Sequence, residues 1–333
     1  MTSLTLDALT CAAIAEALAH TGGSTSSASE RPLGSIRIDS REVTPGDVFV
    51  ALPGERVDGN DFVDDALARG AGAVIASRAP SSDAGDACVF AVPDPLAALQ
   101  ALGGWWRRRF AIPVVAITGS VGKTTTKELI AGLLQDRYRT LKNAGNQNNE
   151  IGVPLTMLAI RPEHERVVTE MGMYQQGEIR SYCEIALPSV GVVTCVRPIH
   201  LDRVGSIEGI EAAKRELPEA LPADGLCVLN ADDPRVLRMA SATAARLLTY
   251  GIDHEADVRA LDLQPRGAEG TTFTLAYAGS RAEVRLRLPG RHQVSNALAA
   301  ATVTLADGFS VAEVADLLGA ARDDIRLRVV RGK

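Results

Sequence analysis

The apolar residues of the chain fall into runs that predict alternating strands and helices. The run from Val114 to Thr118 has no polar side chain before its last residue, which is typical of a strand in a parallel sheet covered on both faces. The alternation continues through strands at 166–170, 190–196 and 226–230 and helices at 123–136, 177–186 and 207–220. This order predicts a doubly wound α/β domain with a mostly parallel sheet.

The first hundred residues predict a separate, smaller α/β domain. Helical apolar spacing covers 7–19, and a mobile loop rich in glycine, serine and threonine is expected at 22–29. Further elements are expected as strands at 36–40, 48–52, 73–76 and 88–92 and as helices at 61–69 and 95–109. We therefore expect two domains, residues 1–108 and residues 109–333.

The last part of the second domain has a different pattern. Residues 257–288 contain runs that predict antiparallel strands at 271–275 and 282–288, and helices near 291–306 and 310–320 follow. A strand-like segment at 325–330 comes just before Lys333. We expect the chain to end abruptly there, without a further domain.

Charge and composition narrow the class of protein. Hydrophobic residues make up 46% of the chain and charged residues 23%, as in soluble globular proteins. The net charge of −6 leaves no basic excess to neutralise phosphates, so we expect no nucleic-acid partner. The one dense basic run, Arg107 to Arg109 after two tryptophans, is interpreted as the solvated end of a helix whose tryptophans pack inward.

Cysteine usage and the N-terminus bear on the compartment. The five cysteines are scattered without a Cys-x-x-Cys pair, so we expect neither a disulfide framework nor a zinc site. The N-terminus lacks the pattern of a signal peptide, and no apolar run is long enough to span a bilayer. The sequence predicts a cytoplasmic protein with no membrane partner.

A phosphate-binding loop is predicted between the strand at 114–118 and the helix that starts near Lys123. Gly119 and Gly122 allow backbone N–H groups to converge on an anion, Lys123 supplies a cation, and Thr124 supplies a hydroxyl for magnesium. Position 117 is isoleucine where the strict motif has glycine, so the loop is a shortened variant of Walker A. We expect ATP to bind to Gly119, Ser120, Val121, Gly122, Lys123, Thr124 and Thr125.

Three other polar positions follow predicted strands, where ligands bind in open α/β sheets. Glu170 ends the strand at 166–170 and is a candidate magnesium ligand. His200 lies shortly after the strand at 190–196; taken alone, it is more often structural than functional. The segment 230–233 is either a ribose or adenine contact or the N-cap of a helix before Pro234.

These residues and several longer motifs resemble the Mur ligases, the ATP-dependent enzymes that form amide bonds in peptidoglycan precursor synthesis. The resemblance covers nearly the whole chain. Its motifs are Asp39-Ser40-Arg41, residues 45–54, residues 117–128, residues 145–156, Glu170-Met171-Gly172 and residues 290–300. Among these, the asparagine-rich segment 145–156 resembles the corresponding segment in the branch of the family that adds D-alanyl-D-alanine.

The resemblance implies a role for each matched residue. Ser40 and Arg41 would bind the UDP-linked substrate, and Asn148 and Asn149 would contact substrate with amides that both donate and accept. Two magnesium ions are implied, with Thr124, Glu170, His200 and Lys214 as the residues that hold them. Lys214 matches a lysine that the family carbamylates, which would make it an anion, and Asn296 and Arg291 match the adenine side.

The sequence also departs from the family pattern. Cys195 stands where asparagine is usual, Arg197 where glycine is common, Gln293 in place of an asparagine and Asn60 in place of a histidine. Each lies beside a matched residue and leaves some room for altered specificity. The family also has a C-terminal domain that binds the incoming amine, and we expect this chain to lack it.

The implied reaction joins two small molecules. A carboxylate of UDP-N-acetylmuramoyl-tripeptide attacks the γ-phosphate of ATP, and the amine of D-alanyl-D-alanine then displaces phosphate from the acyl phosphate. A monomer is expected, and the third residue of the tripeptide cannot be read from the sequence. Two alternatives stay open: a truncated or degenerate ligase that only binds ATP and UDP-sugar peptide, and a switch-type P-loop NTPase.

Overall fold

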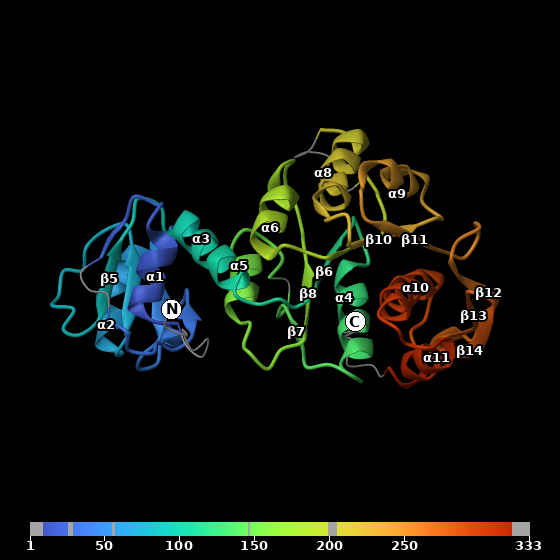
Figure 1. The fold of residues 1–333 in the computed structure, drawn as a ribbon, viewed down its shortest axis with the longest axis horizontal. Coiled ribbons are helices and arrows are strands. Elements are labelled where there is room, and N and C mark those ends of the chain that lie inside the picture. The colour runs from blue at the N-terminus through green and yellow to red at the C-terminus, as the bar shows by residue number, and fades with distance from the viewer. Residues whose placement is uncertain (1–8, 26–28, 55–56, 146, 199–204, 322–333) are drawn as a thin grey trace, which may run out of the picture. The chain divides into compact units, whose positions relative to one another are not determined.

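The computed structural model describes residues 9–25, 29–54, 57–145, 147–198 and 205–321 (Figure 1). The chain forms two compact units. Unit 1 comprises residues 1–111 and 150–163, and unit 2 comprises residues 112–149 and 164–333. Residues 150–163, which the predicted boundary at 108 assigns to the second domain, therefore pack with the first part of the chain.

Unit 1 is built on a sheet of five strands among its described residues, in the order β1-β5-β4-β3-β2. The pairs from β2 to β5 are parallel, and β1 pairs antiparallel with β5. The strands are β1 Ser24–Thr25, β2 Ile36–Arg37, β3 Val48–Val50, β4 Ala73–Ala76 and β5 Cys88–Ala91. The helices are α1 Cys11–Leu18, α2 Val63–Ala68, α3 Pro95–Arg107 and α5 Gly152–Leu158, with 3-10 turns η1 Ser40–Glu42 and η2 Gly59–Phe62.

Two expectations for unit 1 are wrong in part. The loop expected at 22–29 contains β1, which pairs with the edge of the sheet. The strand expected at 36–40 ends at Arg37, because Asp39 accepts a hydrogen bond from the Arg41 N–H at 3.0 Å and starts the turn η1. Polar side chains that bond to their own backbone compete with strand pairing, which explains the early end.

The cysteine prediction also needs correction. Cys11 on α1 and Cys88 on β5 form a disulfide, although 77 residues separate them. Cys183, Cys195 and Cys227 are free and buried. The spacing of the cysteines along the sequence does not indicate this pair, because the two sulfurs come together only when α1 packs against the sheet.

The basic run at the end of α3 is not simply solvated. Arg107 is only 6% exposed and donates to the Phe110 carbonyl, and burial lowers the pKa of its guanidinium. Arg109 lies over the Trp105 ring at 3.5 Å, and Trp106 is buried. The inward packing of Trp106 is confirmed, whereas the solvated position expected for Arg107 is wrong.

Unit 2 contains a sheet of nine strands within its described part, in the order β14-β13-β12-β11-β10-β9-β6-β8-β7. Neighbouring strands from β7 to β12 are parallel, and β12, β13 and β14 pair antiparallel. The strands are β6 Val114–Thr118, β7 Thr140–Lys142, β8 Arg166–Glu170, β9 Val190–Val193, β10 Leu226–Asn230, β11 Arg246–Gly251, β12 Val258–Pro265, β13 Thr271–Tyr277 and β14 Ser280–Leu286. The predicted α/β class with a mostly parallel sheet is confirmed.

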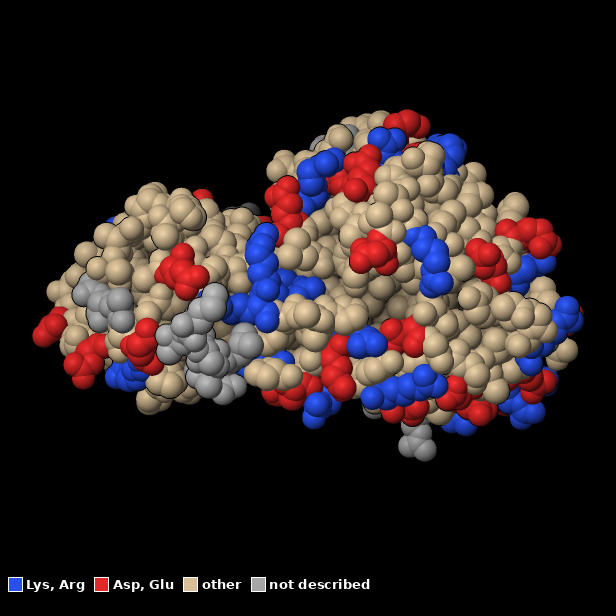
Figure 2. Space-filling model, viewed as in Figure 1, with Lys and Arg blue, Asp and Glu red and all other residues tan. Residues whose placement is uncertain are grey.

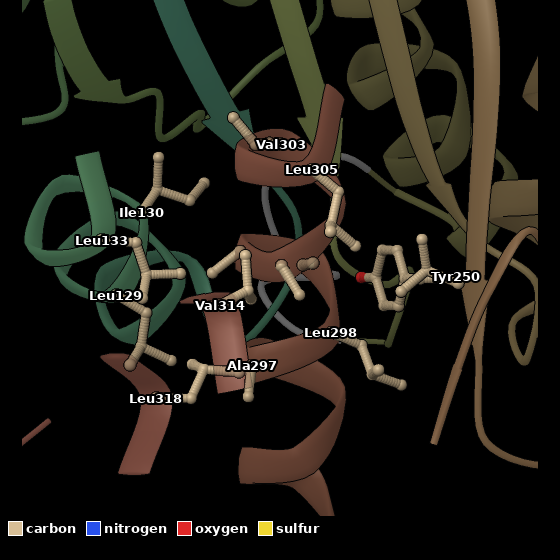
Figure 3. Close-up of a cluster of buried hydrophobic side chains, with 14 of the residues drawn as sticks. Leu129, Ile130, Leu133, Tyr250, Ala297, Leu298, Val303, Leu305, Val314 and Leu318 are labelled. Atoms are coloured by element: carbon tan, nitrogen blue, oxygen red, sulfur yellow. The ribbon is translucent and has the colours of Figure 1, made fainter. Parts of the chain in front are cut away.

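Helices cover both faces of this sheet. Figure 1 shows α6 Glu178–Ala186, α8 Ile207–Ala220 and α9 Pro234–Arg238 on one side and α4 Lys123–Leu134, α10 Arg291–Ala306 and α11 Val311–Ala320 on the other. Gly191 lets α8 approach closely, because a Cβ there would lie 2.9 Å from Leu221. Buried apolar side chains from α4, α10 and α11 form a core on the opposite face, as Figure 3 shows for Leu133, Leu298 and Val314.

The surface of the protein carries mixed charge. On the face that Figure 2 shows, lysine and arginine side chains lie among aspartate and glutamate side chains. Ion pairs such as Arg238–Glu211 at 2.8 Å and Arg166–Asp307 at 3.1 Å are examples of this mixing. Within the described ranges, none of the helices combines the length and apolar character that crossing a bilayer requires.

Candidate functional site

The segment between β6 and α4 forms a tight loop that only glycine can form at two positions. Gly119 has φ +147°, and a Cβ there would lie 1.8 Å from the Thr194 hydroxyl. Gly122 has φ +85°, and its Cβ would lie 2.4 Å from Oδ1 of Asn296 on α10. The loop therefore rests against two other segments of unit 2, and its backbone shape is set by them.

Replacing Gly119 by alanine is expected to lower the affinity for ATP by at least about tenfold, since the methyl group must displace Thr194 and strain the loop. Gly132 on α4 gives a matched control, because a Cβ there meets nothing within 4 Å. Gly132→Ala should keep the affinity and raise the free energy of unfolding by roughly 0.5–1 kcal/mol. Isothermal titration calorimetry measures the ATP affinity of both variants, and denaturant unfolding measures the free energy of unfolding. Equal ATP affinity of Gly119→Ala and wild type would contradict the loop geometry.

Hydrogen bonds hold the loop to the segment that follows β9. The Ser120 N–H donates to the Cys195 carbonyl at 2.8 Å, and the Arg197 N–H donates to the Ser120 hydroxyl at 2.8 Å. The Thr194 hydroxyl donates to the Val121 carbonyl at 2.7 Å. These bonds bend the chain away from the sheet, which explains why the strand predicted at 190–196 ends at Val193.

Lys123 begins α4, and its amine lies over the loop. Its Nζ donates to the Gly119 carbonyl at 2.9 Å and lies 3.5 Å from the Ser120 carbonyl. The N–H groups at the start of α4 have no partner inside the helix, and the helix dipole favours an anion in front of them. The amine and these N–H groups together form a site for a phosphate group.

A carboxylate and a hydroxyl meet beside the loop. The Thr124 hydroxyl donates to Oε2 of Glu170 at 2.7 Å, and the Asn148 amide donates to Oε1 at 2.7 Å. Glu170 is 2% exposed, and among the described residues no lysine or arginine forms an ion pair with it. A buried carboxylate without a cationic neighbour is costly, so hard oxygen donors in this position fit a magnesium ion.

The remaining predicted metal residues are placed only in part. His200 lies outside the described residues. Over the described part of the chain, no three histidine, cysteine, aspartate or glutamate side chains form a cluster that could hold a metal ion. Thr124 and Glu170 are thus the described oxygen donors of the predicted set that lie in contact.

Lys214 lies on α8 and lines the same pocket as Lys123. Its side chain is 4% exposed, and burial, together with the charge of Lys123, lowers the pKa of its amine to about 7. The pocket has a volume of about 130 Å³ and is also lined by Asn148, Asn149 and Tyr174. An amine with this pKa is largely neutral at slightly alkaline pH, unlike an exposed lysine.

The two residues predicted to lie on the adenine side, Asn296 and Arg291, are both on α10. Asn296 is 6% exposed and donates to Oε1 of Gln293 at 3.0 Å. Arg291 is exposed and pairs with Asp253. Asp233 is the N-cap of α9, and its other oxygen accepts from Arg197 at 3.0 Å.

The residues predicted to bind the UDP-linked substrate belong to unit 1. Ser40 is buried, and Arg41 is exposed and pairs with Asp39 at 2.6 Å. The hydrogen bonds from Arg41 lower the pKa of the Asp39 carboxyl to about 2. Asn60, the departure noted above, accepts from the Ser77 N–H at 3.0 Å and so ties η2 to the end of β4.

Sequence reasoning missed two residues beside Glu170. Asn143 follows β7, is 2% exposed and accepts from the Glu170 N–H at 2.9 Å. Lys127 is fully buried on α4, and its amine donates to the carbonyls of Asn143 and Gly145 at 3.1 Å each. The sequence contains one signal for Lys127: it follows three threonines in the helix that starts at Lys123, on a helix that is expected to pack against the sheet.

A parallel strand, a glycine-shaped loop, a lysine and threonine at the start of a helix, and a buried carboxylate at the next strand tip define a P-loop nucleotide-binding α/β protein. Residues 117–304 match the Mur ligase middle domain, and residues 33–102 match the Mur ligase family catalytic domain. The chain belongs to the Mur ligase family.

Curated relatives carry the name UDP-N-acetylmuramoyl-tripeptide–D-alanyl-D-alanine ligase. The protein of this name from Escherichia coli strain K12 is 38% identical over 281 residues, which cover 84% of this chain and 61% of the relative. The one from Mycobacterium tuberculosis strain H37Rv is 40% identical over 319 residues, covering 88% of this chain and 61% of the relative. The chain thus spans about three fifths of the length of these relatives.

Solved structures agree with this assignment. A crystal structure of MurF from Acinetobacter baumannii superposes with a TM-score of 0.87 at 31% identity, covering 96% of this chain and 69% of that one. MurF ligase from Thermotoga maritima in complex with ADP has a TM-score of 0.78 at 32% identity, covering 86% and 66%.

Proposed function

We propose that the protein is an ATP-dependent ligase that adds D-alanyl-D-alanine to UDP-N-acetylmuramoyl-tripeptide in cell-wall precursor synthesis. The observation that carries this proposal is the buried Glu170 carboxylate, 2.7 Å from the Thr124 hydroxyl and beside a phosphate loop. The names of the relatives, and the ADP bound to the Thermotoga maritima structure, support it. The proposed enzyme acts as a cytoplasmic monomer.

A carboxylate is a poor electrophile, so the proposed reaction first transfers the γ-phosphoryl group of ATP to the tripeptide carboxylate. ADP leaves, and the amine of D-alanyl-D-alanine then attacks the acyl carbon and releases phosphate. Both first reactants are anions. Lys123 and the N–H groups at the start of α4 hold the phosphates in line and offset their charge.

Magnesium, when bound, would neutralise phosphate charge between ATP and the tripeptide. Thr124 and Glu170 would hold it, with His200 and carbamylated Lys214 as proposed partners for a second ion. Asn148 and Asn149 line the pocket in front of the loop and would orient the substrate carboxylate there. Ser40 and Arg41 would bind the uridine nucleotide.

Carbamylation of Lys214 gives a pH-dependent prediction. A neutral amine adds carbon dioxide and releases a proton, so the reaction needs the uncharged form of Lys214. Because the pKa of Lys214 is about 7, the carbamate should form at pH 8 and decline as the pH falls through 7. Carbon-13 NMR with labelled bicarbonate measures it. Lys214→Arg should lose the signal and Lys142→Arg should retain it; a signal that survives in Lys214→Arg assigns the carbamate elsewhere.

Phosphate release measured with both substrates tests the proposed function. We expect release only with ATP, magnesium, UDP-N-acetylmuramoyl-tripeptide and D-alanyl-D-alanine together. Release with ATP alone would favour a switch-type NTPase. Binding of ATP and UDP-sugar peptide without release would favour a binding module, and either outcome rejects the ligase for this chain.

A further inference from the structure

Lys127 is a buried charge that the proposed reaction does not use. Its side chain has no exposed surface, and it lies one helical turn after Thr124 on α4. A buried ammonium group is costly unless its protons are bonded, and an apolar side chain of the same volume would fit a helix core at lower cost. The position of its partners indicates what the lysine does.

The partners of Lys127 belong to the segment that supports Glu170. The amine donates to the Asn143 and Gly145 carbonyls at 3.1 Å each and pairs with Glu128 at 3.2 Å. Two of its three protons therefore hold the backbone carbonyls of Asn143 and Gly145, which follow β7. The third bonds to a carboxylate that also pairs with the surface residue Lys142.

Asn143, which Lys127 holds through its carbonyl, also forms a hydrogen bond to Glu170. Its Oδ1 accepts from the Glu170 N–H at 2.9 Å, and its amide donates to the Gln147 carbonyl at 3.2 Å. Asn148, next in the chain, donates to the Glu170 carboxylate at 2.7 Å, and its carbonyl accepts from the Gly172 N–H at 2.7 Å. Asn143 and Gly145 are thus tied to Lys127, and Asn143 and Asn148 are tied to the tip of β8.

These contacts form a closed ring around the candidate metal site. Thr124 and Lys127 lie on the same helix, and each holds the Glu170 segment from a different side: Thr124 through the carboxylate and Lys127 through Asn143. Because α4 also begins at the phosphate loop, the ring fixes the position of the Glu170 carboxylate relative to that loop.

We propose that Lys127 is a positioning residue that orients Glu170 and Asn148 for a divalent cation bound with the nucleotide. The inference rests on the proposed function in one respect, the assignment of Glu170 as a ligand of that cation. The amine of Lys127 bonds to the Asn143 and Gly145 carbonyls and to Glu128, so it acts on Glu170 through Asn143 and the backbone at 145. Groups of this kind around a metal site typically change metal affinity by about 10–100-fold when removed.

The test compares metal binding with metal-free nucleotide binding in the full chain. Lys127→Met removes the charge and the three donors at similar length, and Asn143→Ala breaks the next link. Electron paramagnetic resonance measures Mn²⁺ binding in the presence of ADP, and calorimetry with EDTA measures ADP alone. We expect Mn²⁺ affinity to fall about 10–100-fold in either variant. ADP affinity without metal should stay within about twofold, because the loop contacts are unchanged.

Lys142→Met is the matched control, because the Lys142 amine pairs with the same Glu128, whereas the Asn143 and Gly145 carbonyls accept from Lys127. It should bind Mn²⁺ as the wild type does. The double variant Lys127→Met/Asn143→Ala should lose no more than the larger single loss, since both residues act in one chain of contacts. Lys127→Arg keeps the charge and donors and should recover part of the affinity.

The outcomes separate this inference from the proposed function. Mn²⁺ binding by the wild type with equal affinity in Lys127→Met and Asn143→Ala overturns the inference alone. An equal loss of metal-free ADP binding also overturns it, since Lys127 would then support the whole loop. A wild-type protein that binds ADP but no Mn²⁺ overturns the metal assignment of Glu170 and the inference with it.

Discussion

Replacing Lys123 by alanine is expected to reduce ADP formation from ATP by about 10²–10³-fold. The amine of Lys123 is held over the phosphate loop by the Gly119 carbonyl at 2.9 Å, at the start of the helix that would receive the phosphates. Lys123 is the basic residue of the loop 118–125, and in the proposed reaction its amine would offset the negative charge that develops between the β- and γ-phosphates. The measurement is phosphate release under the complete substrate mixture of the proposed reaction.

The Lys123→Ala substitution should also change the affinities for ATP and ADP to different extents. The proposed role of Lys123 is to reach the terminal phosphates, so Lys123→Ala should weaken binding of a non-hydrolysable ATP analogue more than binding of ADP. Lys142→Ala, which removes an exposed lysine on β7, should change neither quantity. Phosphate release at the wild-type rate in Lys123→Ala would exclude this loop as the ATP site.

Replacing Glu170 by glutamine should have a comparable effect through the metal. Glutamine keeps the shape of the side chain and can still accept from Thr124, but it lacks the negative charge that a magnesium ion needs. We expect ADP formation at 1 mM Mg²⁺ to fall by at least about 10²-fold. Raising the magnesium concentration should recover part of the rate, which a titration of rate against magnesium measures.

Folding should survive this substitution. Glu170 forms no ion pair with a described lysine or arginine, so neutralising it leaves no buried cation without its partner. Thermal unfolding of Glu170→Gln without magnesium should match or exceed that of the wild type. Glu255→Gln, at a side chain that is 90% exposed, is the control for the loss of one carboxylate. A full rate in Glu170→Gln with unchanged magnesium dependence would remove Glu170 from the site.

The parts of the fold that could be predicted are those where a local pattern decides the structure. The strands at 114–118, 166–170 and 226–230 have the predicted bounds, because each contains consecutive apolar residues that are buried in the sheet and ends in a polar residue. The helices at 207–220 and 291–306 also agree with their predicted ranges. Strands β7 and β11 and helix α5 were not predicted, since their short runs are stabilised by neighbours distant in the sequence.

The site likewise contains features that could be predicted from the sequence and features that could not. Thr124 and Glu170 were chosen from their places at a helix start and a strand tip, and the structure brings them to 2.7 Å. The burial of Lys127, the lowered pKa of Lys214 and the Cys11–Cys88 bond depend on which surfaces meet in three dimensions. Residue type and spacing along the chain do not indicate which surfaces meet in the folded protein. The roles of all the predicted site residues stay predictions, those of His200, Ser40 and Arg41 included.

The contact between Gly122 and Asn296 has a consequence for the order of events during synthesis. The glycine that ends the phosphate loop packs against a side chain emerging more than 170 residues later, which must return across a long loop at an entropic cost. A nascent chain that has released the loop but not α10 carries the whole phosphate-binding sequence without the wall that shapes it. The wall of the loop that Asn296 forms is therefore complete only once α10 has been synthesised and has packed against α4.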